Sequence, residues 1–235
     1  MSDPRYTLVT GASRGIGRAA TLELARRGHH IIGLARSKAA LEKLDDEIRA
    51  AGGKGTFVPL DLKDAKAIDA LGAVLHERFG RLDGLLANAG ILGTLGPLQA
   101  VGPRSFEETI EVNLTANWRL IRSFAPLLSA SPSGRAVFMT SGIVPRPRPF
   151  WGPYLAAKAG LEAMVHAWAE EQNKLPLRVN LFDPGATRTE MRANAMPGED
   201  PMSLPAPEDV AQPICDMLEH AETRSGVRVA FRELK

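Results

Sequence analysis

The stretch TGASRGIG, residues 10–17, decides the fold. The apolar run 6–10 before it is typical of a buried strand, and residues 16–27 after it carry apolar side chains at helical spacing up to Gly28. Glycines permit a tight turn and let backbone N–H groups approach a pyrophosphate, toward which the positive end of the following helix would point. A glycine-rich turn alone also fits an ordinary strand-to-helix connection. Here it is the first such turn of the chain, which favours nucleotide binding.

Outward from this turn, predicted strands and helices alternate along the chain. We expect strands at 6–10, 30–35, 55–60, 82–87, 135–140, 177–182 and 227–231. We expect helices at 16–27, 37–50, 64–79, 105–128, 153–173 and 207–219, with a capping box at Ser105 and Glu108. This alternation is typical of an α/β, doubly wound parallel sheet of the Rossmann type, with about seven strands and helices on both faces. No low-complexity linker divides it, so we predict a single domain over 1–235.

The composition excludes several classes of protein. The 235 residues are 44% hydrophobic and 24% charged, as in soluble globular proteins, and the formal net charge is +2. Lys and Arg form no long run and no stretch has the length of a membrane span, so we expect no nucleic-acid or membrane partner. The single Cys215 excludes an internal disulfide, and the histidines show no ligand spacing, so we expect no metal. The N-terminus does not resemble a signal peptide, and together these features predict a cytoplasmic protein.

The end of the second predicted strand bears on the choice of nucleotide. A chain that binds NAD usually places Asp or Glu there, where the carboxylate accepts a hydrogen bond from the ribose 2′-hydroxyl. This sequence has Ala35-Arg36-Ser37 instead, and Arg14 lies in the glycine-rich turn. The guanidinium groups of Arg14 and Arg36 could flank the 2′-phosphate of NADP, whereas a carboxylate at the end of the strand would repel this phosphate. The pattern favours NADP(H) over NAD. The alternative is that both arginines are solvated loop residues.

Tyr154 and Lys158 form the most specific chemical signal in the sequence. A spacing of four residues on the predicted helix 153–173 places both side chains on one face. A free tyrosine has a pKa of about 10, which a nearby ammonium group lowers, and hydride transfer at a carbonyl needs a group that gives or takes a proton. The alternative is an interfacial tyrosine beside a solvated lysine. Tyr6 is the one other tyrosine in the sequence, which makes a chance match less expected.

The spacing G-x-x-x-G-x-G at 11–17 and Y-x-x-x-K at 154–158 resembles the short-chain dehydrogenase/reductase family, and the resemblance extends from Thr7 to about Leu218. It implies that Ser141 binds the substrate oxygen, that Tyr154 is the acid/base, that Lys158 supports it and binds ribose, and that Asn113 holds a water linked to the lysine. It also implies a cofactor site made by Gly11, Ser13, Arg14, Gly15, Ile16, Gly17, Arg36, Asp61, Leu62, Asn88, Ala89, Gly90, Tyr154, Lys158, Pro184, Gly185, Thr187 and Thr189.

Several of these positions also have local interpretations. Asp61, which the resemblance places at the adenine ring, could cap a helix, and Asn88-Ala89-Gly90 could form a simple turn. Asn113 could be a buried amide that the backbone satisfies. Ser141 and the stretch 184–189 could belong to ordinary loops.

We therefore expect an NADP(H)-dependent oxidoreductase that moves hydride between the nicotinamide and a carbonyl or hydroxyl substrate. The alternative function is a non-catalytic dinucleotide-binding regulator or scaffold, against which the complete Ser, Tyr, Lys and Asn set argues. The resemblance implies a homodimer or homotetramer through the long helices, where Trp118 and Trp168 could lie in a subunit interface or in the core. The stretch 226–231 lacks the V-D-G-G that is frequent in the family. The resemblance therefore does not predict the C-terminal contacts that shape the substrate pocket and one subunit interface.

The substrate is a small molecule that the sequence leaves largely undefined. Segment 188–205 is rich in Met and is expected to be a substrate lid. In the preceding proline-rich loop, Phe150 or Trp151 could wall an apolar pocket. Arg146 or Arg148 could attract an anionic carrier, as for a 3-oxoacyl thioester, or could remain solvated. A generic ketone is the broader expectation.

Overall fold

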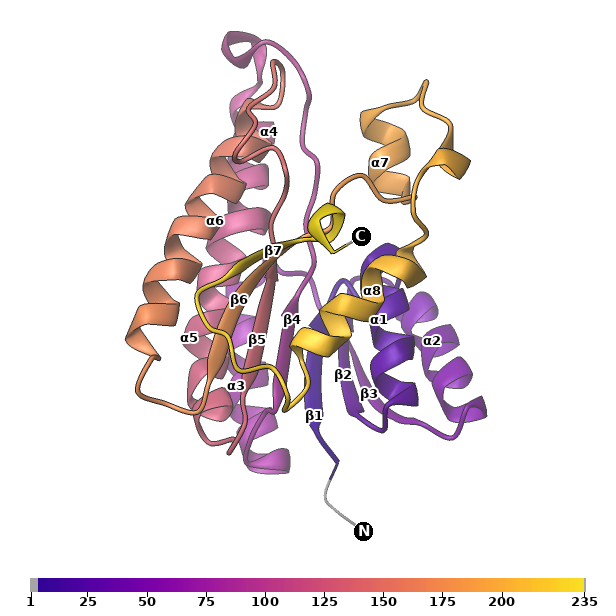
Figure 1. The fold of residues 1–235 in the computed structure, drawn as a ribbon, viewed down its shortest axis with the longest axis vertical. Coiled ribbons are helices and arrows are strands. Elements are labelled where there is room, and N and C mark those ends of the chain that lie inside the picture. Colours follow the sequence, from indigo (N-terminus) through magenta and orange to yellow (C-terminus); the bar gives the residue numbers. More distant parts are fainter. Residues whose placement is uncertain (1–3, 235) are drawn as a thin grey trace.

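The computed structural model describes residues 4–234, and within them seven parallel strands form one sheet (Figure 1). The strands are β1 Tyr6–Thr10, β2 His30–Ala35, β3 Lys54–Pro59, β4 Gly84–Ala87, β5 Arg135–Met139, β6 Arg178–Asp183 and β7 Arg228–Ala230. Their order across the sheet is β3-β2-β1-β4-β5-β6-β7. The doubly wound, Rossmann-type prediction is confirmed. The limits of β1 and β2 are as predicted, and those of the other strands differ from the predicted ones by one or two residues.

Helices cover both faces of the sheet (Figure 1). They are α1 Gly15–Arg26, α2 Lys38–Ala50, α3 Ala65–Phe79, α4 Pro103–Ile110, α5 Ala116–Ser129, α6 Gly152–Glu171, α7 Glu190–Ala195 and α8 Pro207–Met217. One layer contains α1, α2 and α8, and the other contains α3, α5 and α6 (Figure 1). Because strand side chains alternate between faces, Leu8 belongs to one hydrophobic core and its neighbour Val9 to the other.

The sheet reverses its order between β1 and β4. β1 pairs with β2 on one side and with β4 on the other, so the connections after these two strands run to opposite halves of the molecule. In open parallel sheets the carboxyl ends of the strands at such a reversal frame a ligand crevice. The glycine-rich turn follows β1, and Asn88-Ala89-Gly90 follows β4, at this point of the sheet.

The predicted helix at 105–128 differs from the observed one in its start and in its interior. It begins at Pro103, because proline is well suited to the first helical position, and Gly102 precedes it. The predicted capping box is wrong, since the Ser105 hydroxyl lies 2.7 Å from the hydroxyl of Thr94 instead. A π-helical turn, Glu111–Thr115, separates α4 from α5.

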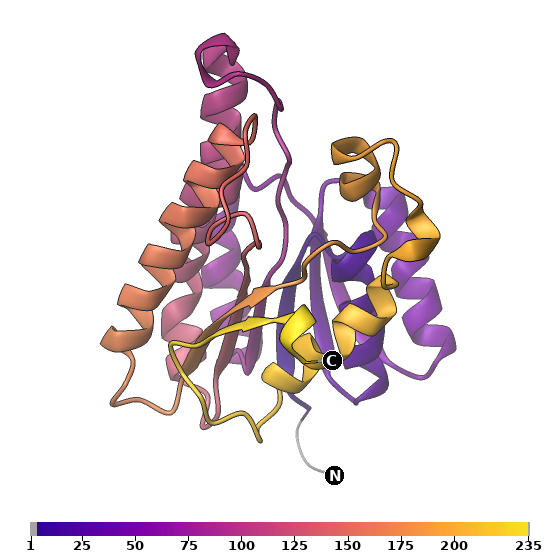
Figure 2. The same ribbon diagram turned by 45° about the horizontal axis from the view of Figure 1, so that its top comes forward.

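The segment 188–205 is more regular than the sequence indicates. It contains α7 and a 3₁₀ turn, Pro201–Ser203, and Arg188 N donates to Pro205 O over 3.0 Å. In both views it stands at the carboxyl end of the sheet, on the side of α1 and α2 and opposite α4 and α6 (Figure 1, Figure 2).

The two tryptophans on the long helices have different surroundings. Trp168 is buried and meets Phe138 edge-on with ring centroids 6.0 Å apart, which confirms the core alternative for this residue. Trp118 on α5 is 46% exposed. Across residues 4–234, no helix has both the length and the apolar character needed to span a membrane, and no group of three His, Cys, Asp or Glu side chains could hold a metal.

Candidate active site

A cavity of about 650 Å³ lies at the carboxyl ends of the strands, at the reversal of strand order. The predicted site residues that line it are Gly11, Ser13, Arg14, Gly15, Ile16, Arg36, Asp61, Leu62, Asn88, Ala89, Gly90, Tyr154, Lys158, Pro184 and Thr189. The predicted residues that lie outside its lining are Gly17, Asn113, Ser141, Gly185 and Thr187. The fold thus brings the segments at the carboxyl ends of six strands, β1 to β6, around one space.

The glycine-rich turn has the shape of an anion cradle. Gly11 and Gly15 have φ of +66° and +55°, in the left-handed region that favours glycine. A Cβ on Gly17 would lie 2.3 Å from the carbonyl oxygen of Gly11, so α1 packs against the turn too closely for any side chain there. Within residues 4–234 no side chain caps α1, and its first turn carries no acidic residue. The N–H groups at this helix end therefore remain suited to a phosphate.

The turn is tied to β4 through Asn88. The backbone N–H groups of Asn88 and Ala89 each donate to the hydroxyl of Thr10 over 3.0 Å, and Asn88 Nδ2 donates to Thr10 O over 3.0 Å. These bonds join the two strands that flank the reversal. Asn88 thus holds the sheet beside the cavity rather than forming a simple turn.

Asn113 holds the next part of the cavity wall. Its side chain is fully buried in the π-helical turn, where Oδ1 accepts from Ile91 N over 2.9 Å and Nδ2 donates to Ile91 O over 2.8 Å. Both ends of the amide are therefore engaged by backbone, as the local alternative states. The water-binding role that the resemblance implies stays a prediction.

Tyr154, Ser141 and Lys158 meet at one end of the cavity. Tyr154 and Lys158 lie one turn apart on α6, are 8% and 4% exposed, and both line the cavity. The side chain of Ser141 lies close enough to the Tyr154 phenol to lower its pKa through hydrogen bonding. Lys158 Nζ lies 5.8 Å from the centre of the tyrosine ring and donates to Met139 O, at the end of β5, over 2.7 Å. The predicted face-sharing of the pair is thus observed, and the lysine is not solvated.

Burial changes the acidity of both groups. It raises the pKa of Tyr154 to about 12, an effect that the Ser141 hydrogen bond opposes and the negative charge of Asp183 reinforces. Burial lowers the pKa of Lys158 to about 8. The sequence pattern predicts that the lysine lowers the pKa of the tyrosine, whereas in the folded chain burial is the largest influence on this pKa and raises it, so the phenol is protonated at neutral pH.

Ion pairs border the opposite end of the cavity. Arg36 is exposed at the end of β2, where no carboxylate follows the strand. Arg14 is paired with Glu190, the first residue of α7, so the glycine-rich turn and segment 188–205 are in contact. Asp61 accepts from Lys63 N over 3.0 Å, and the residue that caps α3 is Asp64. The helix-cap interpretation of Asp61 is therefore wrong.

Some lining residues were not identified from the sequence. They include Lys63 and Glu108, joined by a 2.9 Å ion pair, and the apolar side chains of Ile91, Val112 and Met139. Met139 could have been identified from the sequence, because it is the penultimate residue of the predicted strand 135–140. No sequence signal places Glu108 at the cavity. It belongs to α4, and the position of this helix beside the cavity depends on tertiary packing.

The loop before α6 contributes less than expected. Phe150 is 58% exposed, and Arg146 and Arg148 are exposed, and none of the three lines the cavity. Trp151 does not line it either, but its ring meets that of Tyr154 at 5.8 Å between centroids. The solvated alternative for the two arginines is therefore favoured.

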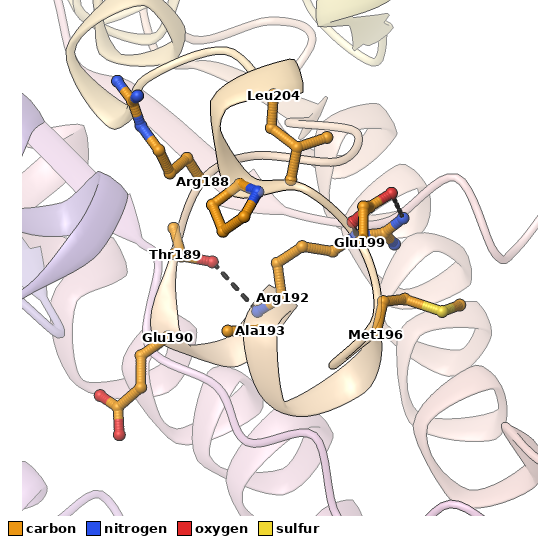
Figure 3. A pocket seen from close by; sticks show the side chains of 9 residues that line it. Arg188, Thr189, Glu190, Arg192, Ala193, Met196, Glu199 and Leu204 are labelled. Carbon is orange, nitrogen blue, oxygen red and sulfur yellow. Dashed lines mark hydrogen bonds and ion pairs between the residues drawn. The ribbon is translucent and has the colours of Figure 1, made fainter.

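A second hollow, of about 300 Å³, lies within segment 188–205 (Figure 3). Arg192 and Glu199 both line this hollow and form an ion pair, in which Arg192 Nη2 lies 2.6 Å from Glu199 Oε1 (Figure 3). The carboxylate of Glu190 points away from them (Figure 3). Thr189 Oγ1 accepts from Arg192 N over 3.3 Å and caps α7 (Figure 3). Neither Tyr154 nor Lys158 lines this hollow, so it is not the place of the chemistry.

Comparison with known proteins identifies the class. A sequence model of the family described as short chain dehydrogenase matches residues 5–200. The uncharacterized oxidoreductase YciK of Escherichia coli (strain K12) is 38% identical over 209 residues, which cover 88% of this chain and 82% of that protein. The NADPH-dependent pterin aldehyde reductase of Arabidopsis thaliana is 30% identical over 80% of this chain and 76% of that protein.

A solved structure agrees with these relatives. The short chain dehydrogenase from Escherichia coli CFT073, complexed with NADPH, has a TM-score of 0.92 and 35% identity, and the match covers 96% of this chain and 95% of that one. The protein described here belongs to the short-chain dehydrogenase family of oxidoreductases.

Proposed function

We propose that this protein is an NADPH-dependent reductase of small carbonyl compounds in which Tyr154 donates the proton. The observation that carries the proposal is the meeting of the Tyr154 phenol, the Ser141 hydroxyl and the Lys158 ammonium group beside a cavity that begins at a phosphate-suited helix end. A structural relative complexed with NADPH and an NADPH-dependent relative support the choice of cofactor.

The residues that line the cavity fit NADPH, with its pyrophosphate and its 2′-phosphate. The glycine-rich turn and the start of α1 would hold the pyrophosphate, because a Cβ at Gly17 is excluded and the helix N–H groups are free of a side-chain cap within the described residues. Arg36 would pair with the 2′-phosphate, together with Arg14 when the latter leaves Glu190. Asp61 and Leu62 would meet the adenine, and Pro184 and Thr189 the nicotinamide.

The chemistry divides between the cofactor and the protein. When bound, NADPH supplies the hydride. Tyr154 donates a proton to the carbonyl oxygen, and with its raised pKa of about 12 the phenol carries that proton at neutral pH. Ser141 orients the same oxygen by hydrogen bonding. Lys158, with a pKa of about 8, is mostly an ammonium group at neutral pH and stabilises the phenolate that forms.

The cavity has an apolar part of its lining, to which Ile91, Leu92, Val112, Met139 and Met191 belong. We therefore propose a carbonyl compound with an apolar body, and a lid function for segment 188–205, which supplies Met191 from α7. An acidic carrier such as a 3-oxoacyl thioester has less support, because the exposed Arg146 and Arg148 do not line the cavity.

The assembly and the location are proposals of the same kind. The exposed Trp118 on α5 supports a homodimer or homotetramer that forms through the helices α5 and α6. The buried, unpaired Cys215 is compatible with a reducing cytoplasm.

The test is NADPH oxidation with a panel of ketones, quinones, sugars and 3-oxoacyl thioesters. Tyr154→Phe removes only the hydroxyl, so kcat should fall about 10²–10⁴-fold while NADPH affinity stays nearly unchanged. Tyr6→Phe, which changes the one other tyrosine, is the matched control and should keep full activity. A Tyr154→Phe variant with substantial activity refutes the role of the phenol. A wild type that binds NADPH but reduces no carbonyl supports the scaffold alternative.

A further inference from the structure

Arg228, in the short strand β7, lies where three elements of the active site converge. Leu181 of β6 pairs with Arg228 in the sheet register, which places the guanidinium group near the carboxyl ends of β5 and β6. Its Nε donates to Glu162 Oε1 over 2.9 Å, and its Nη2 donates to Asp183 Oδ2 over 3.0 Å. The same Nη2 donates to the backbone oxygen of Ser141 over 3.2 Å.

The two acidic partners belong to elements of the catalytic group. Glu162 follows Lys158 by one helical turn and Tyr154 by two, so the three share a face of α6. Asp183 is the last residue of β6, and its Oδ1 accepts from Gly185 N over 2.9 Å. Glu162 Oε1 also accepts from the hydroxyl of Thr140 over 2.5 Å. One guanidinium group therefore joins α6, β6 and the loop that carries Ser141.

The network is largely withdrawn from solvent. The side chains of Arg228, Glu162 and Asp183 are 20%, 13% and 3% exposed. In such surroundings a charge that loses its partner is costly, so these groups hold one another in a defined geometry. The fit around the loop is tight, since a Cβ on Gly142 would lie 3.1 Å from Asp183 Oδ2.

We propose that Arg228 is a positioning residue for the reduction: it clamps the backbone of Ser141 between α6 and the end of β6 and so keeps the Ser141 hydroxyl beside Tyr154 and the substrate oxygen. The clamp rests on the proposed function of this site. Arg228 also neutralises part of the charge of Asp183, whose field raises the pKa of Tyr154. It does not line the cavity, so its effect passes through Ser141.

The experiment compares Arg228→Met, Arg228→Lys and the double variant Arg228→Met/Glu162→Gln. The reaction is NADPH-driven reduction of phenanthrenequinone, or of the panel carbonyl that the wild type reduces fastest. Arg228→Met should lower kcat about tenfold to a hundredfold, because small misplacements of catalytic groups have effects of this size, and should change KM for NADPH less than about twofold. Arg228→Lys keeps the charge with fewer donors and should recover part of kcat.

Two controls separate positioning from folding. Arg228→Met leaves Glu162 and Asp183 without their cationic partner. The double variant removes one of these two carboxylates, so it should recover part of the lost thermal stability but not kcat. Arg178→Met removes a guanidinium group that bonds backbone oxygens at the other end of β6, and should leave kcat unchanged. Recovery of kcat in the double variant, or unchanged kcat in Arg228→Met, overturns the proposal.

A second measurement tests the clamp without turnover. Hydrogen exchange of the amides in 140–144 should speed up in Arg228→Met and in the double variant, while exchange in 11–17 stays as in the wild type. Unchanged exchange in 140–144 overturns the clamp. A wild type that binds NADPH but reduces no carbonyl contradicts the proposed function alone, and the exchange result still decides the clamp.

Discussion

At the scale of single residues, the burial of the charged Lys158 lowers the stability of the folded protein at a position that the proposed reaction uses. Its side chain is 4% exposed, and its Nζ donates to the backbone oxygen of Met139. Burial lowers its pKa from 10.5 to about 8, which corresponds to a free-energy cost of about 3 kcal/mol for the charged form. Active sites often accept such a cost, because the charge is needed where the chemistry occurs.

Lys158→Met should therefore stabilise the protein at pH 7 while it removes activity. We expect a gain of about 1–3 kcal/mol, since the lost hydrogen bond to Met139 offsets part of the relieved desolvation. Urea denaturation measures the change. A variant that is less stable than the wild type at pH 7 would contradict the cost assigned to this charge.

The same lysine predicts how stability depends on pH. The folded protein releases this proton at about pH 8 and the unfolded chain at 10.5, so between these values the unfolded chain binds more protons. Stability of the wild type should gain from this group as pH rises across that window, and the advantage of Lys158→Met should shrink over the same range. Denaturation at pH 7 and pH 10 checks the sign, and an advantage that grows with pH would exclude this account.

At the scale of elements, the π-helical turn between α4 and α5 positions a side chain that bonds the backbone of the cavity wall. It carries Asn113, whose amide satisfies both backbone groups of Ile91. Buried backbone groups without partners are costly, and Ile91 and its neighbour Gly90 line the cavity. The irregular helix thus supports the cavity wall.

Asn113→Ala should lose about 2–4 kcal/mol of stability, because two backbone groups lose their partners, and should weaken NADPH binding. Asn117→Ala is the matched control. Asn117 is also buried, but its amide donates to one backbone oxygen within the helix, that of Asn113, so the loss should be smaller and NADPH affinity unchanged. Chemical denaturation and NADPH fluorescence titration provide the two readouts. Equal effects in both variants would argue against the special role of the turn.

At the scale of the whole molecule, the cavity joins the two halves of the fold. Residues after β1 and β2 face residues after β4, β5 and β6 across it, and the Arg14–Glu190 pair connects the glycine-rich turn to α7. A ligand in this cavity would contact both halves of the fold at once. Its binding should therefore raise the free energy of unfolding of the whole domain.

NADPH at a hundred times its Kd should stabilise the fold by about 2.7 kcal/mol and raise Tm by about 5–10 °C. NADH at the same concentration should have a smaller effect, because Arg36 has no 2′-phosphate to meet. Arg36→Glu should reverse this order, and Lys43→Glu, on the exposed face of α2, makes the same charge change away from the cavity and should not. Thermal denaturation with each nucleotide is the measurement, and equal shifts for both in the wild type would contradict the NADP preference.

The sequence alone determined the parallel sheet, the glycine-rich turn and the shared face of Tyr154 and Lys158. Each depends on residues close together in the chain, where spacing fixes geometry: apolar runs specify strands, glycines specify the turn, and four residues make one helical turn. The position of Arg36 directly after β2 was predictable for the same reason, because the end of a strand can be recognised from its apolar run, while its contact with a 2′-phosphate stays a prediction.

Tertiary structure alone decided the contacts between distant segments and the acidity of the buried groups. The contacts in question join residues that no local pattern connects: the Arg14–Glu190 and Lys63–Glu108 ion pairs and the hydrogen bond from Arg228 to the backbone oxygen of Ser141. The rise in the pKa of Tyr154 is likewise collective, since it comes from all the atoms that exclude water from the phenol. Spacing along a helix shows which groups are neighbours, but desolvation and long-range pairing exist only once the layers have packed.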